Sequence, residues 1–186
     1  MDGRNALITG SSRGLGRAMA LNFAASGANV VICGRRENLL SETLKEVEAV
    51  SDTKAFAFVG DVSTAAGVAK LLDNAENALG HIDILINNAG ILPDYQMPAL
   101  DADIAIIEKT FSTNTLGPLR VSKAVVPKMT AGGRIINISS GMGQLEDMQA
   151  GHVAYRLSKV SLNALSVILS KELLSKNIKV NTICPG

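Results

Sequence analysis

The sequence predicts an α/β fold in which a parallel sheet is covered by helices on both faces. Short apolar runs alternate along the chain with longer segments of helical periodicity, as in parallel strands joined by helices. A glycine-rich turn, Thr9 to Gly16, directly follows the first apolar run. No repeat, linker or low-complexity segment interrupts this alternation, so residues 1–186 are expected to form a single domain.

The apolar runs predict six strands, at residues 6–8, 29–33, 55–59, 82–86, 134–138 and 178–183. Right-handed crossovers between them predict a Rossmann-like, doubly wound parallel sheet with strand order 3-2-1-4-5-6. Apolar side chains at helical spacing predict helices from residue 17, over 36–50, over about 68–79, over 104–129 and over 153–175. Pro118 falls inside the fourth helix and is expected to distort it.

Composition excludes several classes of protein. Of the 186 residues 47% are hydrophobic and the formal net charge is +1, which indicates a globular protein without an electrostatic reason to bind nucleic acid or an anionic membrane. Cys33 and Cys184 lie in apolar strand-like runs and are expected to be reduced, buried thiols rather than a disulfide or metal site. A strand already begins at residue 6, and no apolar run has the length of a membrane span. We therefore expect a cytoplasmic protein without a metal.

The turn after the first strand has the features of a phosphate-binding site. It reads Thr9-Gly10-Ser11-Ser12-Arg13-Gly14-Leu15-Gly16 and leads into a helix-forming segment. Glycines let the backbone approach a pyrophosphate, and the free N–H groups at a helix start face an anion. The spacing is GxxxGxG, one residue looser than the common GxGxxG pattern.

Five other residues are candidates for chemistry. Tyr155 and Lys159 are four positions apart in a predicted helix, so the phenol and the ammonium group share one face. Ser139 and Ser140 close the fifth strand, at the sheet edge where ligands bind in such folds. Asn114 lies in the preceding long helix.

Together these motifs resemble the short-chain dehydrogenase/reductase family. The resemblance covers the whole chain and rests on TGSSRGLG at 9–16, NNAG at 87–90, Asn114, Ser140, YxxxK at 155–159 and Cys-Pro-Gly at 184–186. It implies hydride transfer between a carbonyl and an alcohol, with Tyr155 as the acid or base and Lys159 lowering its pKa and holding the nicotinamide ribose. Ser140 would hydrogen-bond the substrate oxygen, and Asn114 would fix a water that links Lys159 to solvent. Ser139 is the alternative, but the Ile-x-Ser pattern of the family favours Ser140.

The resemblance also assigns the cofactor site. Its residues would be Gly10, Ser12, Arg13, Gly14, Leu15, Gly16, Arg35, Asp61, Val62, Asn88, Ala89, Gly90, Tyr155, Lys159, Pro185 and Gly186. The second strand ends in Gly34-Arg35-Arg36 rather than in a carboxylate, and Arg13 lies in the glycine turn. Guanidinium groups match a 2′-phosphate, so NADP(H) is expected to be preferred over NAD(H). The segment between Ser140 and Tyr155 is longer than the family usually shows, which affects the substrate pocket.

Partners and alternatives follow from the same features. The expected ligand is a small carbonyl or alcohol, and the apolar helices 104–129 and 153–174 predict a homodimer or homotetramer. His152 is expected to be a loop residue rather than a catalytic one, and Tyr95 to be a surface residue, with contact to substrate as the alternative. A cofactor-binding regulator without turnover is the alternative function. The family's segment after Pro185-Gly186, which closes over substrate and adds a seventh strand, is not in the sequence, so a truncated chain with poor turnover is a further expectation.

Overall fold

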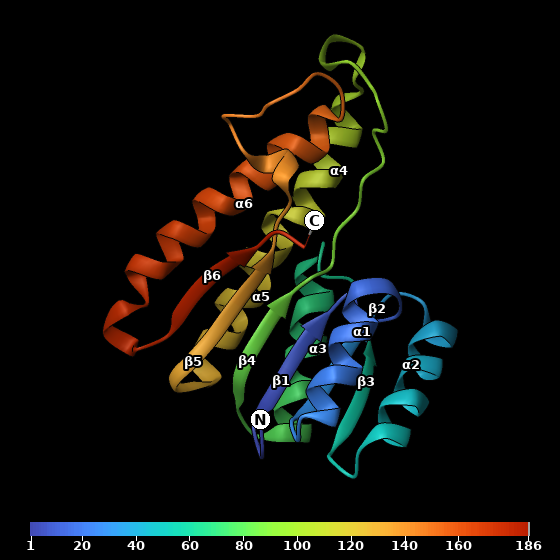
Figure 1. The fold of residues 1–186 in the computed structure, drawn as a ribbon, viewed down its shortest axis with the longest axis vertical. Helices are drawn as coiled ribbons and strands as arrows, with labels where there is room; N and C mark the ends of the chain where they lie inside the picture. Colours follow the sequence, from blue (N-terminus) through green and yellow to red (C-terminus); the bar gives the residue numbers. More distant parts are fainter. Residues whose placement is uncertain (186) are drawn as a thin grey trace.

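The computed structural model describes residues 1–185, which form one six-stranded parallel sheet with helices on both faces (Figure 1). The strand order is β3-β2-β1-β4-β5-β6, as predicted. The strands are β1 (Asn5–Thr9), β2 (Asn29–Gly34), β3 (Ala55–Val59), β4 (Ile82–Asn87), β5 (Met129–Ile138) and β6 (Lys179–Ile183). The helices are α1 (Gly14–Ala25), α2 (Glu37–Val50), α3 (Ala65–Leu79), α4 (Ile104–Asn114), α5 (Leu116–Val125) and α6 (Val153–Glu172).

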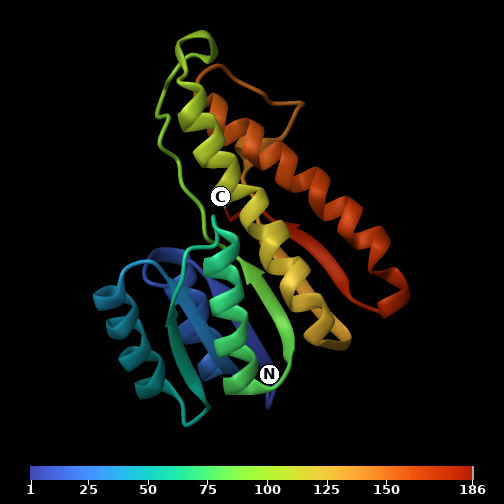
Figure 2. The same ribbon diagram turned by 180° about the vertical axis from the view of Figure 1, so that it is seen from behind.

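Alternate side chains of the central strand supply the two halves of the core. Ala6 and Ile8 face α1 and α2, whereas Leu7 faces α3 and α5, and all three side chains are fully buried. Viewed from behind, α3, α5 and α6 lie over the sheet, and α4 extends beyond the carboxyl ends of the strands (Figure 2). The continuous apolar run at residues 6–8 therefore corresponds to a strand that is covered on both faces.

The predicted helix over 104–129 is wrong in one respect, because it is two helices separated at Thr115. Thr115 leaves ideal helical geometry (φ −117°, ψ −58°), and its hydroxyl donates to the carbonyl of Ser158 in α6 at 2.9 Å. Pro118 lies in the first turn of α5, where backbone N–H groups have no partner within the helix, so the proline is tolerated there. Strand β5 also begins earlier than predicted, at Met129.

The prediction that both cysteines are buried is correct for Cys33 and wrong for Cys184. Cys33 is buried in β2, and burial together with the charge of Asp61 raises its pKa to about 12. Cys184 follows β6 and is exposed. Its strand-like surroundings in the sequence misled because β6 forms the edge of the described sheet and four of its five residues are exposed. Of the helices in residues 1–185, none combines the length and apolar character of a membrane span.

Candidate active site

A pocket of about 820 Å³ opens at the carboxyl edge of β1, β2, β3 and β4. It is lined by twelve of the residues expected to bind cofactor, namely Gly10, Ser12, Arg13, Gly14, Leu15, Gly16, Arg35, Asp61, Val62, Asn88, Ala89 and Gly90. The lining also includes Cys33, Gly34, Arg36, Gly60, Ile91 and Thr113. Of these six residues, only Arg36 was considered from the sequence as part of the cofactor site.

The turn after β1 is locked to the turn after β4. The Thr9 hydroxyl accepts hydrogen bonds from the backbone N–H groups of Asn88 and Ala89, both at 3.1 Å. The Asn88 amide in turn donates to the carbonyls of Thr9 and Gly10, at 2.9 and 3.1 Å. Two segments about 80 residues apart thus form one rigid edge of the pocket.

Close packing explains why glycine is needed at two positions. A Cβ on Gly10, whose φ is +68°, would lie 2.7 Å from the Cα of Ala89. A Cβ on Gly16 would lie 2.4 Å from the carbonyl oxygen of Gly10. The contacted atoms are backbone and cannot rotate away, so neither position accepts a side chain without a shift of the turn.

Helix α1 presents its N-terminus to the pocket. The helix begins at Gly14, and within the described chain its N-cap residue, Arg13, makes no side-chain cap hydrogen bond. Its first turn holds no acidic side chain. The free N–H groups and the positive end of the helix dipole suit an anion. The glycine cradle and this helix start therefore fit a dinucleotide pyrophosphate.

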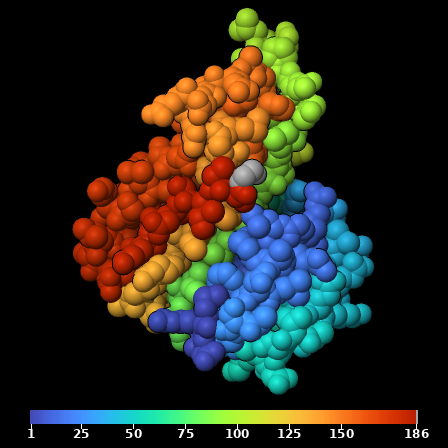
Figure 3. All heavy atoms as spheres, in the orientation of Figure 1, coloured from blue at the N-terminus to red at the C-terminus, as the bar shows by residue number. Residues whose placement is uncertain are grey.

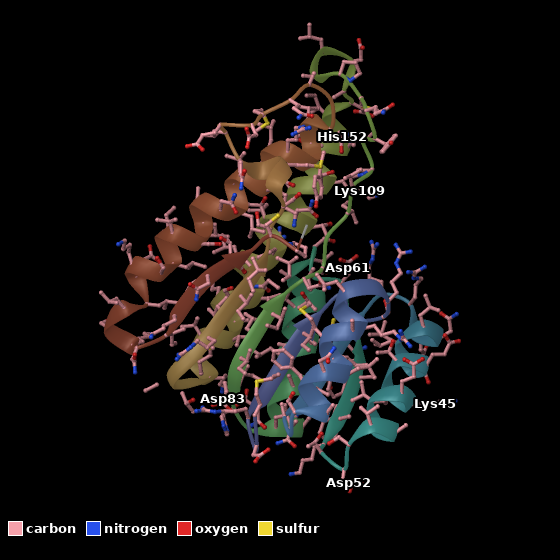
Figure 4. The ribbon with its side chains drawn as sticks, in the orientation of Figure 1. Lys45, Asp52, Asp61, Asp83, Lys109 and His152 are labelled. Atoms are coloured by element: carbon pink, nitrogen blue, oxygen red, sulfur yellow. The ribbon has the colours of Figure 1, made fainter. Side chains whose placement is uncertain are left out.

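The far side of the pocket is basic. Arg13, Arg35 and Arg36 line it and are all exposed. Arg35 lies 3.8 Å from the carboxylate of Asp61, whose side chain Figure 4 shows at the carboxyl edge of the sheet. Burial opposes ionisation of Asp61, but hydrogen bonds from Ser63 and the charge of Arg35 outweigh burial and lower its pKa. The Arg35 guanidinium is thus held near the pocket by an ionised partner.

Ser140 and Ser139 have different surroundings. The Ser139 hydroxyl is buried and donates to Asn163 in α6 at 2.6 Å. Ser140 is half-buried, accepts from the backbone N–H of Met142 at 3.2 Å, and lies near enough to the Tyr155 phenol to lower its pKa. The structure therefore brings Ser140, rather than Ser139, to the phenol.

Tyr155 and Lys159 project from the first two turns of α6. The Lys159 ammonium lies 5.5 Å from the centre of the Tyr155 ring and donates to the carbonyl of Ile138 at 2.7 Å. Lys159 is 4% exposed, and this burial lowers its pKa to about 8. Burial raises the pKa of Tyr155, although Ser140 partly opposes this. Without a nicotinamide cofactor, the protein's own groups thus favour a protonated phenol.

The nucleotide pocket meets these side chains at Gly90. A Cβ on this glycine would lie 3.5 Å from Asn114 Oδ1 and 3.8 Å from Lys159 Nζ. Gly90 itself lines the pocket. Gly90 therefore lies between the pocket and two of the catalytic candidates.

Asn114 makes contacts that the sequence did not indicate. Its side chain is fully buried and exchanges hydrogen bonds with both backbone groups of Ile91, at 2.8 and 2.9 Å. It also donates to the Ser158 hydroxyl at 3.0 Å. Both amide hydrogens are therefore used by protein groups, so the carboxamide ties the segment after β4 to α6.

Other residues of interest lie at the ends of α6 and β6. Asp94, missed at the sequence level, accepts hydrogen bonds from the first turn of α6. Pro185 is exposed directly after Cys184, and the expected contact of Gly186 lies outside the described residues. His152 precedes α6, and Figure 4 shows it apart from Asp61, higher in the view.

Comparison with known proteins identifies this arrangement. A family model described as short chain dehydrogenase matches residues 4–186. The chain belongs to the short chain dehydrogenase family. It is 33% identical over 188 residues to versicolorin reductase 1 of Dothistroma septosporum, covering all of this chain and 70% of that protein. It is 37% identical over 199 residues to oxidoreductase UcpA of Escherichia coli strain K12, again covering 100% and 70%.

Solved short chain dehydrogenase structures share the fold. The crystal structure of a blue fluorescent protein from a metagenomic library in complex with NADPH superposes with a TM-score of 0.92 at 31% identity, covering 100% of this chain and 74% of that one. NAD⁺-bound xylitol dehydrogenase gives a TM-score of 0.92 at 28% identity, covering 100% and 70%. Both nicotinamide dinucleotides thus occur among the relatives, so the family supports nicotinamide cofactor use without deciding the preference.

Proposed function

We propose that this short chain dehydrogenase reduces a small carbonyl compound to an alcohol, or oxidises the alcohol, with NADP(H). The observation that carries the proposal is that Gly90, which lines the glycine-rich pocket, lies beside the ammonium group of Lys159, which in turn lies over the Tyr155 ring. A pocket that only bound a nucleotide would have no need of a phenol beside a buried ammonium group.

Each side chain has a role in this proposal. When bound, the nicotinamide would supply or accept the hydride. Ser140 would donate a hydrogen bond to the carbonyl oxygen, and Tyr155 would donate its proton to the oxygen as negative charge develops there. Burial raises the pKa of the Tyr155 phenol, which favours its protonated form and suits the acid role in reduction. Lys159 would stabilise the phenolate that remains.

Preference for NADP(H) rests on the basic wall of the pocket. Arg13, Arg35 and Arg36 are three guanidinium groups that line the pocket, and β2 ends without a carboxylate that could accept from a ribose hydroxyl. Among the relatives, structures contain NADPH and NAD⁺, so the chain's own charges are the argument for the phosphate-bearing cofactor.

The function is tested by mixing the 186-residue chain with NADPH and a panel of ketones, aldehydes and sugars, and following the absorbance of NADPH. We expect carbonyl-dependent oxidation of NADPH that is faster than oxidation of NADH. Tight NADPH binding without oxidation by any carbonyl would favour the alternative, a regulator that binds the cofactor without turnover.

We also propose that the protein is a homodimer or homotetramer. Apolar side chains on α4 and α6 face outward, with Ile104, Val167 and Ile168 each more than half exposed. A two-fold contact between copies is the most common way to cover such faces. Light scattering at micromolar concentration should therefore give a mass of at least two chains, and a mass near 19.4 kDa would refute this.

A further inference from the structure

Helix α6, which carries Tyr155, does not cap its own N-terminus. Its N-cap residue is His152, which adopts left-handed backbone geometry (φ +53°) and makes no side-chain cap hydrogen bond within the described chain. The first turn contains no acidic residue. The N–H groups of the first turn have no carbonyl partner within the helix, so other groups must satisfy them.

Asp94 supplies that cap from the segment between β4 and α4. Its Oδ2 accepts from the N–H of Ala154 at 2.6 Å and from the N–H of Tyr155 at 3.3 Å. The side chain is fully buried, although Asp94 lies 60 residues before Ala154 in the chain. A carboxylate at this place also faces the positive end of the helix dipole.

The neighbours of Asp94 hold the same end of the helix. The backbone N–H of Gln96 donates to His152 Nδ1 at 3.1 Å. The Tyr95 ring meets the His152 ring edge to face, with 5.2 Å between their centres. The segment 94–96 therefore clamps the residue at which α6 begins, and Asp94 is its buried member.

The backbone carbonyl of Tyr155 is held from the same segment. The Ser158 hydroxyl donates to this carbonyl at 2.7 Å and accepts from Asn114 at 3.0 Å. Asn114 is bonded to Ile91, which lies three residues before Asp94. Both peptide groups of Tyr155 are thus tied to the segment 91–94, which continues directly from the pocket residues Asn88, Ala89 and Gly90.

An ordinary helix cap does not require this arrangement. Burying a carboxylate is costly unless its oxygens are paired, and Oδ1 of Asp94 is buried without a hydrogen-bond partner among residues 1–185. Asp103 caps α4 from an exposed position, accepting from Ala105 at 2.9 Å, and serves as the comparison within the same chain. The cost of burial at Asp94 points to a role that an exposed cap would not serve.

We propose that Asp94 is a positioning residue that fixes Tyr155 relative to the nucleotide pocket. Since the reaction of Tyr155 is part of the proposed function, the inference rests on that function for its catalytic consequence. Its structural content is independent, because the hydrogen bonds from Ala154 and Tyr155 exist whether or not the chain turns over.

The test compares Asp94→Ala with Asp103→Ala, which removes a helix cap of the same kind away from Tyr155. Hydrogen exchange of individual amides should accelerate at Ala154 and Tyr155 in the Asp94 variant and at Ala105 in the control. We expect Asp94→Ala to lower kcat by roughly 10- to 100-fold, because small misplacements of a reacting group have effects of that size. Its KM for NADPH should stay near that of the parent, and Asp103→Ala should retain the parental kcat.

Two conservative variants keep the proposal falsifiable where Asp94→Ala does not fold. Asp94→Asn retains a short acceptor and should restore most of kcat, since asparagine caps helices about as well as aspartate. Asp94→Glu lengthens the side chain by one methylene, displaces the acceptor and should lower kcat in a folded protein. Equal kcat in the Asn and Glu variants would overturn the proposal.

The proposed function and this inference fail in different ways. Suppose that hydrogen exchange becomes faster only at Ala154 and Tyr155, and that no carbonyl compound supports oxidation of NADPH by the parent chain. This result would support the positioning role of Asp94 and contradict the proposed function. Unchanged exchange at these two amides would overturn the positioning whatever the activity. If Asp94→Ala lowers kcat by no more than Asp103→Ala does, the positioning role would also be overturned, because the fall would then reflect loss of stability alone.

Discussion

In the nucleotide half of the site, backbone atoms and exposed charges line the pocket, whereas the catalytic half consists of buried and half-buried side chains. The first half comes from β1, α1, β2 and the turn after β4. A Cβ added to Gly16 or Gly10 would lie only 2.4 or 2.7 Å from backbone atoms, so these positions exclude side chains. The second half comes from Ser140 and α6, where Lys159 is 4% exposed. Figure 3 shows the N-terminal part in blue and cyan beside the C-terminal part in orange and red.

This difference predicts different responses to change. A backbone cradle tolerates no added atom, while an exposed charge is screened by water and salt. A buried charge is sensitive to pH, because burial shifts its pKa. Variants in the two halves should therefore fail in distinguishable ways.

The largest effect is expected at Gly16. Alanine there places a Cβ 2.4 Å from the Gly10 carbonyl oxygen and 2.5 Å from the Asn88 amide, so the turn must shift. We expect Gly16→Ala to weaken NADPH binding by at least roughly 100-fold and to lower the free energy of unfolding by about 1–3 kcal/mol. Fluorescence titration and denaturant unfolding measure the two effects.

Gly132→Ala is the matched control. Its φ is +89°, so alanine is strained there, yet no heavy atom of the described chain outside the adjoining residues lies within 4 Å of the added Cβ. The control should lose stability and keep NADPH affinity. Equal affinities for NADPH in the two variants would contradict the account of the cradle.

The buried ammonium group predicts a dependence of stability on pH. The pKa of Lys159 is about 8 in the folded protein, below its ordinary value of 10.5, so the unfolded chain binds more protons between these values. The contribution of Lys159 to the free energy of unfolding should therefore rise as pH increases from about 8 to 10, by roughly 2–3 kcal/mol in total.

Lys159→Met removes the titrating group and keeps most of the volume. The difference in unfolding free energy between parent and variant, measured by denaturant titration at several pH values, should change across this window in favour of the parent. A difference that stays constant from pH 7 to about 10 would mean that the ammonium group is not desolvated.

Arg35 is expected to give the smallest effect, since its side chain is 58% exposed. Arg35→Ala should reduce the preference for NADPH over NADH by roughly 10- to 100-fold, the size expected for a charge-assisted hydrogen bond. The reduction should shrink as salt increases. Arg17→Ala is the control, because Arg17 pairs with Glu46 and is not among the pocket-lining residues. Equal weakening of NADPH and NADH binding by Arg35→Ala would remove Arg35 from the phosphate site.

The same comparison explains what could be predicted from the sequence. The nucleotide half was predictable because Gly10, Gly14 and Gly16 are close in the chain and their spacing reports a local turn. The strand order also followed from the alternation of strands and helices, and the structure confirms it. The position of Tyr155 and Lys159 on one helix face required only helical periodicity.

What the sequence missed depends on contacts between distant segments. Asp94 caps a helix that begins about 60 residues later, and no spacing rule connects the two. The break at Thr115 is accompanied by a hydrogen bond from its hydroxyl to Ser158, 43 residues away. The rise in the pKa of Tyr155 comes mainly from burial, which the i, i+4 pattern does not contain. The supporting contacts of the catalytic half were therefore not accessible from local pattern.

The central claim, that Tyr155 moves the proton, is tested most directly by Tyr155→Phe. The variant keeps the ring and removes only the hydroxyl. Carbonyl-dependent NADPH oxidation should fall by roughly 10²- to 10⁴-fold, while the Kd for NADPH stays near that of the parent, because the pocket is formed by other residues. A variant that retains about a tenth or more of the parental turnover would contradict the claim.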